Sequence, residues 1–409
     1  MKKKILFVDD EPEILSGLRR MLRKFWHEWD MVFAESGQMA LKFLEETPFD
    51  VVVTDMRMPG MDGAELLERV ARRYPGTVRI VLSGYSDQDM VMRTVSVAHQ
   101  YLSKPCDADE LKRVIEQAAV LRDTIYNDRV KEVVSGMETV PSCPSLYLKV
   151  TEALKSPDIS LQAIGEIIAK DVGMTAKILQ LVNSAFFGLP RKITNITQAV
   201  GILGLETIRT LVLMAGVFRA FGHVRFSGFN LESLWEHAMT VGRYARALGE
   251  DVSVPPGVSD AIYLAGMLHD VGKFILAASF SEGFGKILEI SEKEGRPLYQ
   301  VEWEKYQTSH AEVGGYLMGI WGLPDDIVTA IAFHHVPTQA GVSQMSPLLF
   351  VHLANGFSHL PLDERRDWTR EFPEVFDREF LSRVGVLDKM AAWEETCRKI
   401  QDSGRGNGE

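Results

Sequence analysis

Five polar side chains stand at the ends of short β-rich runs in the first part of the chain, and their types suit phosphoryl transfer. They are Asp9, Asp10, Asp55, Ser83 and Lys104. Grouped carboxylates suit Mg²⁺, which takes one or two of them together with phosphate oxygens. Asp55 would attack a phosphoryl donor to give an aspartyl-phosphate, and Ser83 and Lys104 would bind the phosphoryl oxygens. Any one of these residues alone would be an ordinary polar residue, but together they predict a phosphorylation site.

The elements that must position these residues alternate between strand and helix patterns. The β-rich runs lie at residues 5–8, 31–34, 51–54, 79–83 and 100–103. Intervening segments carry apolar residues at steps of three and four, which is typical of amphipathic helices. The alternation predicts an α/β doubly wound, five-stranded parallel sheet with helices on both faces. In such a sheet the carboxyl ends of the strands face one pocket, where these polar residues would meet.

The composition sets limits on the whole chain. A length of 409 residues predicts more than one domain, and a net charge of -11 argues against direct binding of nucleic acid. The three cysteines fit neither a disulfide framework nor a zinc knuckle, so a reducing compartment is expected. No run of about 18 apolar residues stands out, so we expect no membrane segment and a cytoplasmic location.

The motifs around the polar residues resemble those of a known family. ILFVDDE, VVVTDMRMPGMDG, LSGYSD and YLSKP are similar to the receiver domain of bacterial two-component response regulators, a flavodoxin-like fold. The resemblance covers residues 1–121 and implies a cognate sensor histidine kinase as phosphoryl donor. It implies these roles: phosphoacceptor Asp55, Mg²⁺ ligands Asp9, Asp10, Asp55 and the main-chain carbonyl of Arg57, phosphoryl-binding Ser83 and Lys104, and aromatic switch residue Tyr101.

The second half of the chain contains a polar pair in an apolar segment. LAGMLHDVGKFIL, residues 264–276, has apolar residues at helical spacing and predicts a core helix that carries His269 and Asp270. His237 also lies on the apolar stripe of its predicted helix. Buried polar groups need partners, so these residues either form hydrogen bonds within a helical core or bind a metal. Both interpretations stay open at this point.

Motifs of this half, among them NSAFFG, ITNITQAVGILG and LHDVGK, resemble the HDOD family, which is related to the HD metal-dependent phosphohydrolases. The resemblance implies an all-α HD-like output domain over residues 137–335 that acts through protein–protein interaction. A helical linker at residues 122–136 would precede it. A helical extension would follow at residues 336–409, with a disordered tail, QDSGRGNGE, at residues 401–409.

The order of histidines is similar to the ligand order of the HD-GYP cyclic dinucleotide phosphodiesterases. The matching residues are His237, His269, Asp270, His310, His334 and His335, with Lys273 at the lysine of the HDxGK motif. Such a set would bind Fe, Mn or Zn. However, Asn355 stands where a final carboxylate is expected, and the segment after His335 lacks the GYP loop.

Two functions follow from these resemblances. The first is a phosphorylation-switched signalling protein whose HDOD domain contacts an unknown downstream protein, with a homodimer among the arrangements that could transmit the signal. The alternative is a receiver-regulated, metal-dependent phosphohydrolase of a nucleotide or cyclic dinucleotide. The missing carboxylate and loop favour the first, in which the HDOD domain is not catalytic.

Overall fold

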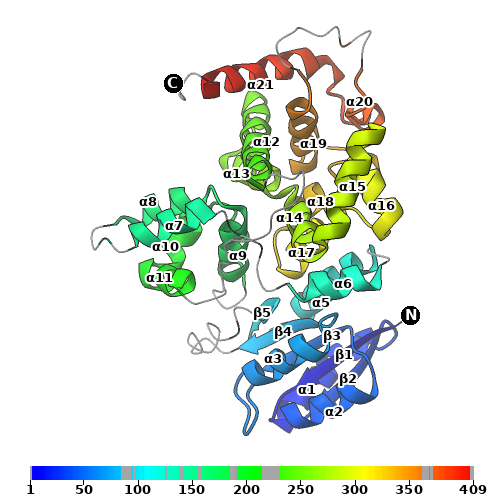
Figure 1. Cartoon of the computed structure of the whole chain (residues 1–409). Coiled ribbons are helices and arrows are strands. Elements are labelled where there is room, and N and C mark those ends of the chain that lie inside the picture. The colour runs from blue at the N-terminus through cyan, green and yellow to red at the C-terminus, as the bar shows by residue number, and fades with distance from the viewer. Residues whose placement is uncertain are drawn as a thin grey trace.

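A computed structural model gives the fold of the chain (Figure 1). It describes residues 2–83, 94, 97–104, 106–124, 127–137, 140, 142, 144–154, 156, 159–184, 189, 191–213, 231–361, 368 and 372–405. An α/β domain forms the N-terminal part and helices form the rest, which confirms the predicted fold class.

The N-terminal domain is a five-stranded parallel sheet in the order β2-β1-β3-β4-β5. Its elements are β1 (Lys3–Val8), α1 (Pro12–Met21), η1 (Leu22–Phe25), β2 (Trp29–Ala34), α2 (Gly37–Glu46), β3 (Val51–Asp55), α3 (Gly63–Arg73), β4 (Val78–Ser83), β5 (Gln100–Ser103) and α5 (Ala108–Thr124). Each predicted strand is present, because buried runs between polar turns are a local signal that the fold preserves.

Helices account for the remaining described elements. They are α6 (Asp128–Ser135), α7 (Pro144–Ala153), α8 (Leu161–Ile168), α9 (Val172–Val182), α10 (Ile196–Leu203), α11 (Leu205–Leu213), α12 (Leu231–Asp251), α13 (Pro256–Leu268), α14 (Val271–Ser279), α15 (Ser281–Glu294), α16 (Leu298–Tyr306), α17 (His310–Ile320), α18 (Asp325–Phe333), η3 (Pro337–Ala340), α19 (Pro347–Ser358), α20 (Arg378–Val384), η4 (Leu387–Lys389) and α21 (Met390–Arg405).

Alternation along the strands divides the core of the α/β domain between its two faces. Ile5 and Phe7 lie on one face and Leu6 and Val8 on the other, as a period of two requires, and all are at most 1% exposed. The face with Leu6 packs on α2 and α3. The face with Ile5 belongs to a hydrophobic cluster that continues through α5 and α6 into the helical part. The two parts of the chain therefore share one apolar core.

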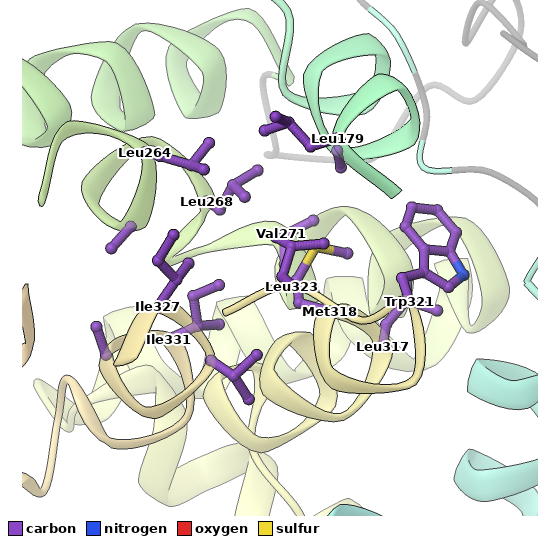
Figure 2. Close-up of a cluster of buried hydrophobic side chains, with 14 of the residues drawn as sticks. Leu179, Leu264, Leu268, Val271, Leu317, Met318, Trp321, Leu323, Ile327 and Ile331 are labelled. Atoms are coloured by element: carbon purple, nitrogen blue, oxygen red, sulfur yellow. The ribbon is translucent and has the colours of Figure 1, made fainter. Parts of the chain in front are cut away.

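The central helices of the helical part meet in a cluster of buried apolar side chains. Figure 2 shows Leu179 of α9, Leu268 of α13, Val271 of α14, Leu317 of α17 and Ile331 of α18 directed toward a common interior. These side chains are fully buried. Helices that carry the predicted histidines are thus fixed relative to one another by apolar packing.

The edge strand β5 is covered by the helical part (Figure 1). Gln180 of α9 donates from Nε2 to the main-chain oxygens of Ala98 (3.3 Å) and His99 (2.9 Å). Gln100 donates from its own Nε2 to the oxygen of Gly319 in α17, at 3.3 Å. These contacts lie at the entry to β5 and join the edge of the sheet to the helices.

A fully buried arginine forms the joint between β4 and α6. Arg79 donates from Nε to the oxygen of Val97 (2.6 Å) and from Nη2 to that of Ser135 (2.9 Å). His99 Nδ1 accepts the Arg79 main-chain N–H (3.1 Å), so its Nε2 carries the proton and donates to Ser135 O at 2.7 Å. Burial and the charge of Arg79 lower the pKa of His99 well below its ordinary value. The Ser135 hydroxyl also bonds Tyr316 of α17, at 2.7 Å.

The prediction of one helix across residues 264–276 is wrong. Helix α13 ends at Leu268 and α14 begins at Val271, so His269 and Asp270 lie in the break between them. The apolar residues keep their spacing across the break, which hid it in the sequence. Gly272 allows the close approach of α14 to α17, because a Cβ at this position would overlap the main-chain oxygen of His310.

Two other segments bear on predicted boundaries. The linker consists of α6 and the end of α5, and Asn127 caps α6 by accepting a hydrogen bond from the main-chain N–H of Val130 at 3.2 Å. Both helices pack on α17, so the linker is fixed against the HDOD helices and does not extend through solvent. Helix α21 continues to Arg405, which contradicts disorder from residue 401 onward, and residues 406–409 lie outside the described chain.

One segment has the length and composition of a membrane span. It covers Pro256–Ser279, but 83% of its most apolar window is buried inside the protein. Its apolar character is explained by its place in the core.

Gly272→Ala should strongly destabilise the protein, because the added methyl group meets main-chain atoms of α17 rather than a side chain that can move. We expect a loss of at least about 2 kcal/mol in the free energy of unfolding, measured by urea denaturation. The matched control is Gly285→Ala in α15, where nothing lies within 4 Å of the new Cβ. That change should be neutral or stabilise by up to about 1 kcal/mol. Equal effects of the two changes would contradict the packing of α14 on α17.

Candidate functional site

The predicted acidic pocket forms at the carboxyl ends of the strands. Strands β1 and β3 are neighbours with Val8 opposite Thr54, so Asp9 and Asp55 emerge side by side. Lys104, which follows β5, places its ammonium 2.7 Å from Asp9 Oδ2 and also forms an ion pair with Asp55. The structure therefore brings Asp9, Asp55 and Lys104 together as predicted.

Electrostatics in this pocket are set by burial and by Lys104. Burial raises the pKa of Asp55, and the hydrogen bond from Lys104 opposes that effect. Desolvation disfavours the charged form of Lys104, but its bonds to Asp55 and Asp9 outweigh desolvation and raise its pKa. Asp55 Oδ2 also accepts the main-chain N–H of Arg57 at 2.7 Å, which fixes the carboxylate.

The pocket fits a divalent cation by charge. Asp9 is 1% exposed, Asp10 beside it is half-buried, and together with Asp55 they outnumber the single ammonium of Lys104. Oxygen ligands with surplus negative charge are what Mg²⁺ prefers. Arg57 lies two residues after Asp55, within reach for its carbonyl to contribute.

The remaining residues of this predicted site are placed differently. Tyr101 is 2% exposed and points inward, with its hydroxyl 3.1 Å from Thr94 Oγ1. Burial raises the pKa of Tyr101 well above its ordinary value. Ser83 ends β4, but the predicted contact of its side chain lies outside the part of the structure that is described.

A second cluster surrounds Asp270, in the break between α13 and α14. One group of possible metal-ligand atoms comprises Asp270, His310, His334 and His335, and another comprises His237, His269 and Asp270. Within each group the atoms lie within 4.8 Å of one another. Asp270 belongs to both groups, so its two carboxylate oxygens can face two neighbouring centres. All the histidines that the sequence predicted are brought together.

The carboxylate of Asp270 has close basic neighbours on both oxygens. Its Oδ2 lies 2.6 Å from Lys273 Nζ and 3.3 Å from His269 Nε2, and its Oδ1 lies 3.2 Å from His310 Nε2. Burial alone would raise the pKa of Asp270, but His269 and Lys273 hold it well below the ordinary value. Asp270 is therefore an anion whose own side chain is almost fully buried, at 1% exposure.

Several imidazoles are oriented as metal ligands are. His269 Nδ1 donates to Gly266 O (2.7 Å) and His334 Nδ1 to Ile331 O (2.8 Å). Backbone acceptors of this kind fix the tautomer and direct Nε2 toward a metal. Among the described residues, no group has hydrogen-bond geometry to the buried Nε2 atoms of His237, His269 and His334 or to Asp270 Oδ1, although His310 Nε2 lies 3.2 Å from that oxygen. Such orphaned atoms are costly in a core and fit a metal that completes them.

The pKa directions of three of these histidines agree with this orientation. Burial lowers the pKa of His237 to about 3, and burial with neighbouring imidazoles holds those of His334 and His335 well below the ordinary value. Neutral imidazole is the form that binds metals.

Glu302 of α16 is a member of the cluster that sequence reasoning missed. It is fully buried, and its Oε2 accepts the main-chain N–H of His310 (2.8 Å) and the ring Nδ1–H (2.6 Å). Burial disfavours a charged His310, but the Glu302 carboxylate outweighs it and raises the pKa of His310. A capping box of Ser309 and Glu312 starts α17 at His310. No sequence signal connects Glu302 to that helix start.

Two further aromatic residues border the cluster and were also missed. The ring of His359 lies 5.2 Å from that of His237, and Tyr299 stacks on His335 at 4.6 Å. Asn355 of α19 is 6% exposed, and its side-chain oxygen has no hydrogen-bond partner among the described residues. Its amide supplies no negative charge.

Comparisons with known proteins support two separate domains. A model of the response regulator receiver domain matches residues 5–116, and a model of the HDOD domain matches residues 140–337. An uncharacterized protein of Treponema pallidum is 28% identical over 203 residues, which cover 50% of this chain and 39% of that protein. The hydrogenase transcriptional regulatory protein HoxA of Cupriavidus necator is 38% identical over 116 residues, which cover 28% of this chain and 23% of HoxA.

The chain thus spans less than half the length of these two curated relatives. Among solved structures, the response regulator MmoQ from Methylococcus capsulatus is similar at 20% identity and a TM-score of 0.47, covering 63% of this chain and 97% of that one.

His269→Ala should lower the transition-metal content of the protein, because it removes a buried imidazole whose Nε2 faces Asp270. We expect close to one or two metal ions per wild-type chain and a clear loss in the variant, measured by elemental analysis after purification without added metal or chelator. The control is His27→Ala, whose side chain is 72% exposed. Equal metal in all three proteins, or none in the wild type, would contradict a metal site.

Proposed function

We propose that this chain, a response regulator in which a receiver domain (residues 5–116) precedes an HDOD domain (residues 140–337), is a phosphorylation-switched signalling protein that acts through protein–protein contacts. The observation that carries the proposal is the direct contact of His99 and Gln100, at the entry to β5, with the HDOD helices α9 and α17. The strand that leads to Lys104 also touches the output domain.

The chemistry at the receiver follows from its pocket. An Asp55 carboxylate oxygen forms a bond to the phosphorus of the donor, a phosphohistidine of a sensor kinase, while the bond from phosphorus to the donor nitrogen breaks. Mg²⁺ held by Asp9, Asp10, Asp55 and the Arg57 carbonyl would supply charge neutralisation. Lys104, which now pairs with Asp9 and Asp55, is positioned to pair with a phosphoryl oxygen instead. Ser83 would hydrogen-bond another.

The switch then uses strand β5. A shift of Lys104 toward the phosphoryl group pulls on the end of β5, whose other end holds Gln100 against Gly319. Phosphorylation adds close to two negative charges, enough to rearrange neighbouring loops. Tyr101, between these two ends, changes its packing with the strand. The HDOD domain is then released or reoriented to present a face to a downstream protein in the cytoplasm.

The histidine cluster supports a second candidate, a metal-dependent phosphohydrolase regulated by the receiver. Its buried, orphaned imidazole nitrogens and the bridging position of Asp270 suit Fe, Mn or Zn. Against catalysis, Asn355 is neutral, and Lys273 already binds Asp270 at 2.6 Å. Loss of a carboxylate ligand impairs orientation of an attacking water more than it impairs metal binding. We therefore place the metal in a structural role.

Asp55→Asn should abolish labelling of the full chain by a radiolabelled acyl phosphate, because the amide cannot form the acyl-phosphate bond. The control is Asp30→Asn at an exposed position of β2, which should label like the wild type. Labelling is measured on the intact protein after removal of free donor. If the Asp55 variant still takes up label, the phosphoacceptor assignment fails.

Metal-loaded wild-type protein should not hydrolyse a cyclic dinucleotide or a generic phosphodiester, with or without acyl phosphate. The comparison variant is Asn355→Asp, which restores a carboxylate and should give more turnover than the wild type if charge at this position is what limits hydrolysis. Product formation is followed by chromatography. Metal-dependent turnover by the wild type that is lost in Asp270→Asn would establish the phosphohydrolase instead.

A further inference from the structure

A cavity of about 350 Å³ lies between the receiver and the HDOD domain. Its size falls in the range of small-molecule sites, roughly 300 to 1,000 Å³. The receiver side is formed by β5 and α5. The HDOD side is formed by the end of α9, by Leu189, Arg191 and Lys192, and by the two residues that follow α17. Figure 1 shows these elements meeting at the junction of the two domains. The cavity is distinct from the acidic pocket and from the histidine cluster.

Positive charge predominates in the cavity lining. Arg113 comes from the receiver, Arg191 and Lys192 come from the HDOD domain, and Glu110 is the one acidic residue in the described lining. No described residue forms an ion pair or hydrogen bond with the guanidinium of Arg113 or Arg191. These exposed guanidinium groups can therefore turn toward an anion at little cost.

The surroundings of Lys192 disfavour the charged form of its ammonium group. The residue as a whole is exposed, but its ammonium reaches inward and donates to the main-chain oxygen of Asn183 at 2.7 Å. Desolvation at that place, and secondly the charge of Arg113, lower the pKa of Lys192 to about 8. An anion between Lys192 and Arg113 would relieve this repulsion.

Gln180 forms a neutral polar part of the cavity wall. It is 2% exposed and lines the cavity. Its Nε2 faces the two carbonyl oxygens of Ala98 and His99, which fixes the amide orientation, because the oxygen cannot point at carbonyls. The Oε1 atom has no hydrogen-bond partner among the described residues, but it is buried and not open to the cavity. Gln180 therefore adds no charge to the wall and leaves anion binding to the three basic residues.

We propose that this cavity binds a small organic anion. Its phosphate or carboxylate group is held by Arg113, Arg191 and Lys192. Arginine suits either anion because its fork of donors matches two oxygens. Apolar lining from Leu102, Val114 and Trp321 accommodates the organic body.

The position of the site gives the ligand a regulatory effect. Its contacts come from both domains, so the ligand binds the docked arrangement and not a separated one. Binding of this kind stabilises the docked state by mass action. Tyr101 is part of the wall, so the ligand and the phosphorylated receiver would act on the same strand.

The test uses the full chain in isothermal titration calorimetry with AMP, citrate and adenosine as probes. AMP presents a phosphate with hydroxyl and amino donors, citrate presents carboxylates with a hydroxyl, and adenosine lacks the anion. If only AMP binds, the ligand belongs to the phosphate class. If only citrate binds, it belongs to the carboxylate class. If both bind, the site recognises the negative charge that the two probes share. Failure of both up to about 1 mM, or adenosine binding as tightly as AMP, overturns the proposal.

Arg113→Gln and Arg191→Gln should each weaken binding of the successful probe by roughly tenfold or more, since each removes a charge-assisted hydrogen bond. The matched control is Arg72→Gln on α3, an exposed arginine far from the cavity lining, which should bind like the wild type. The substituted side chains are exposed, so the unfolding temperature checks that the fold is intact. Affinities that do not differ among the three variants overturn the site.

The same titration on Asp55→Asn separates this proposal from the proposed function. The cavity contains no atom of Asp55, so probe binding should persist in that variant. Persistence supports an independent ligand site whether or not the phosphorylation assignment holds. Loss of binding in Asp55→Asn would overturn the independence of the site.

Discussion

Asp270 carries a negative charge at 1% exposure, and a buried charge is tolerated only with close partners. The helical part of the chain is arranged around this requirement. The chain breaks between α13 and α14 to place the carboxylate, and α12, α17 and α18 converge so that each brings an imidazole to it. Apolar packing among these helices would allow other registers, whereas the polar cluster allows one. Sliding any of these helices by a turn would take its imidazole away from the buried carboxylate of Asp270.

The contact between the domains follows from a different constraint, the edge of the parallel sheet. Strand β5 contains only Gln100–Ser103, about 13 Å at 3.3 Å per residue. At one end it meets the HDOD domain through Gln100, and directly beyond the other end Lys104 contacts Asp55. The chemistry and the output are therefore separated by a single short strand. A change in the position of Lys104 needs no long pathway to reach α17.

The features that could be predicted from sequence are local or ordered along the chain. Asp9, Asp55 and Lys104 follow strands, and parallel strands bring such residues together without further information. The set of histidines around Asp270 was found because its order matches a known ligand order. The prediction that these histidines contact one another needed one further assumption, that the helices pack as they do in the proteins with that ligand order.

The features that could not be predicted depend on contacts between distant segments. The break at His269 and Asp270 keeps the apolar period of its flanks, so periodicity cannot detect it. Glu302 reaches His310 only because α16 packs beside α17. Gln180 and Gln100 look like ordinary surface residues in sequence, and only the docked domains show that they are buried.

The Arg79 joint limits how freely this receiver can be exchanged. The bonds from Gln180 and Gln100 go to main-chain oxygens, which any polypeptide supplies. The contact with Ser135 depends instead on the particular side chains of Arg79 and His99, which another receiver need not possess. A chimera with a receiver from another protein would preserve the hydrogen bonds to main-chain oxygens. It would lose the hydrogen bonds from Arg79 and His99 that hold Ser135 at the end of α6. Recombination between regulators would thus produce a working hybrid only if the arginine, the histidine and the linker helix moved as one inherited block.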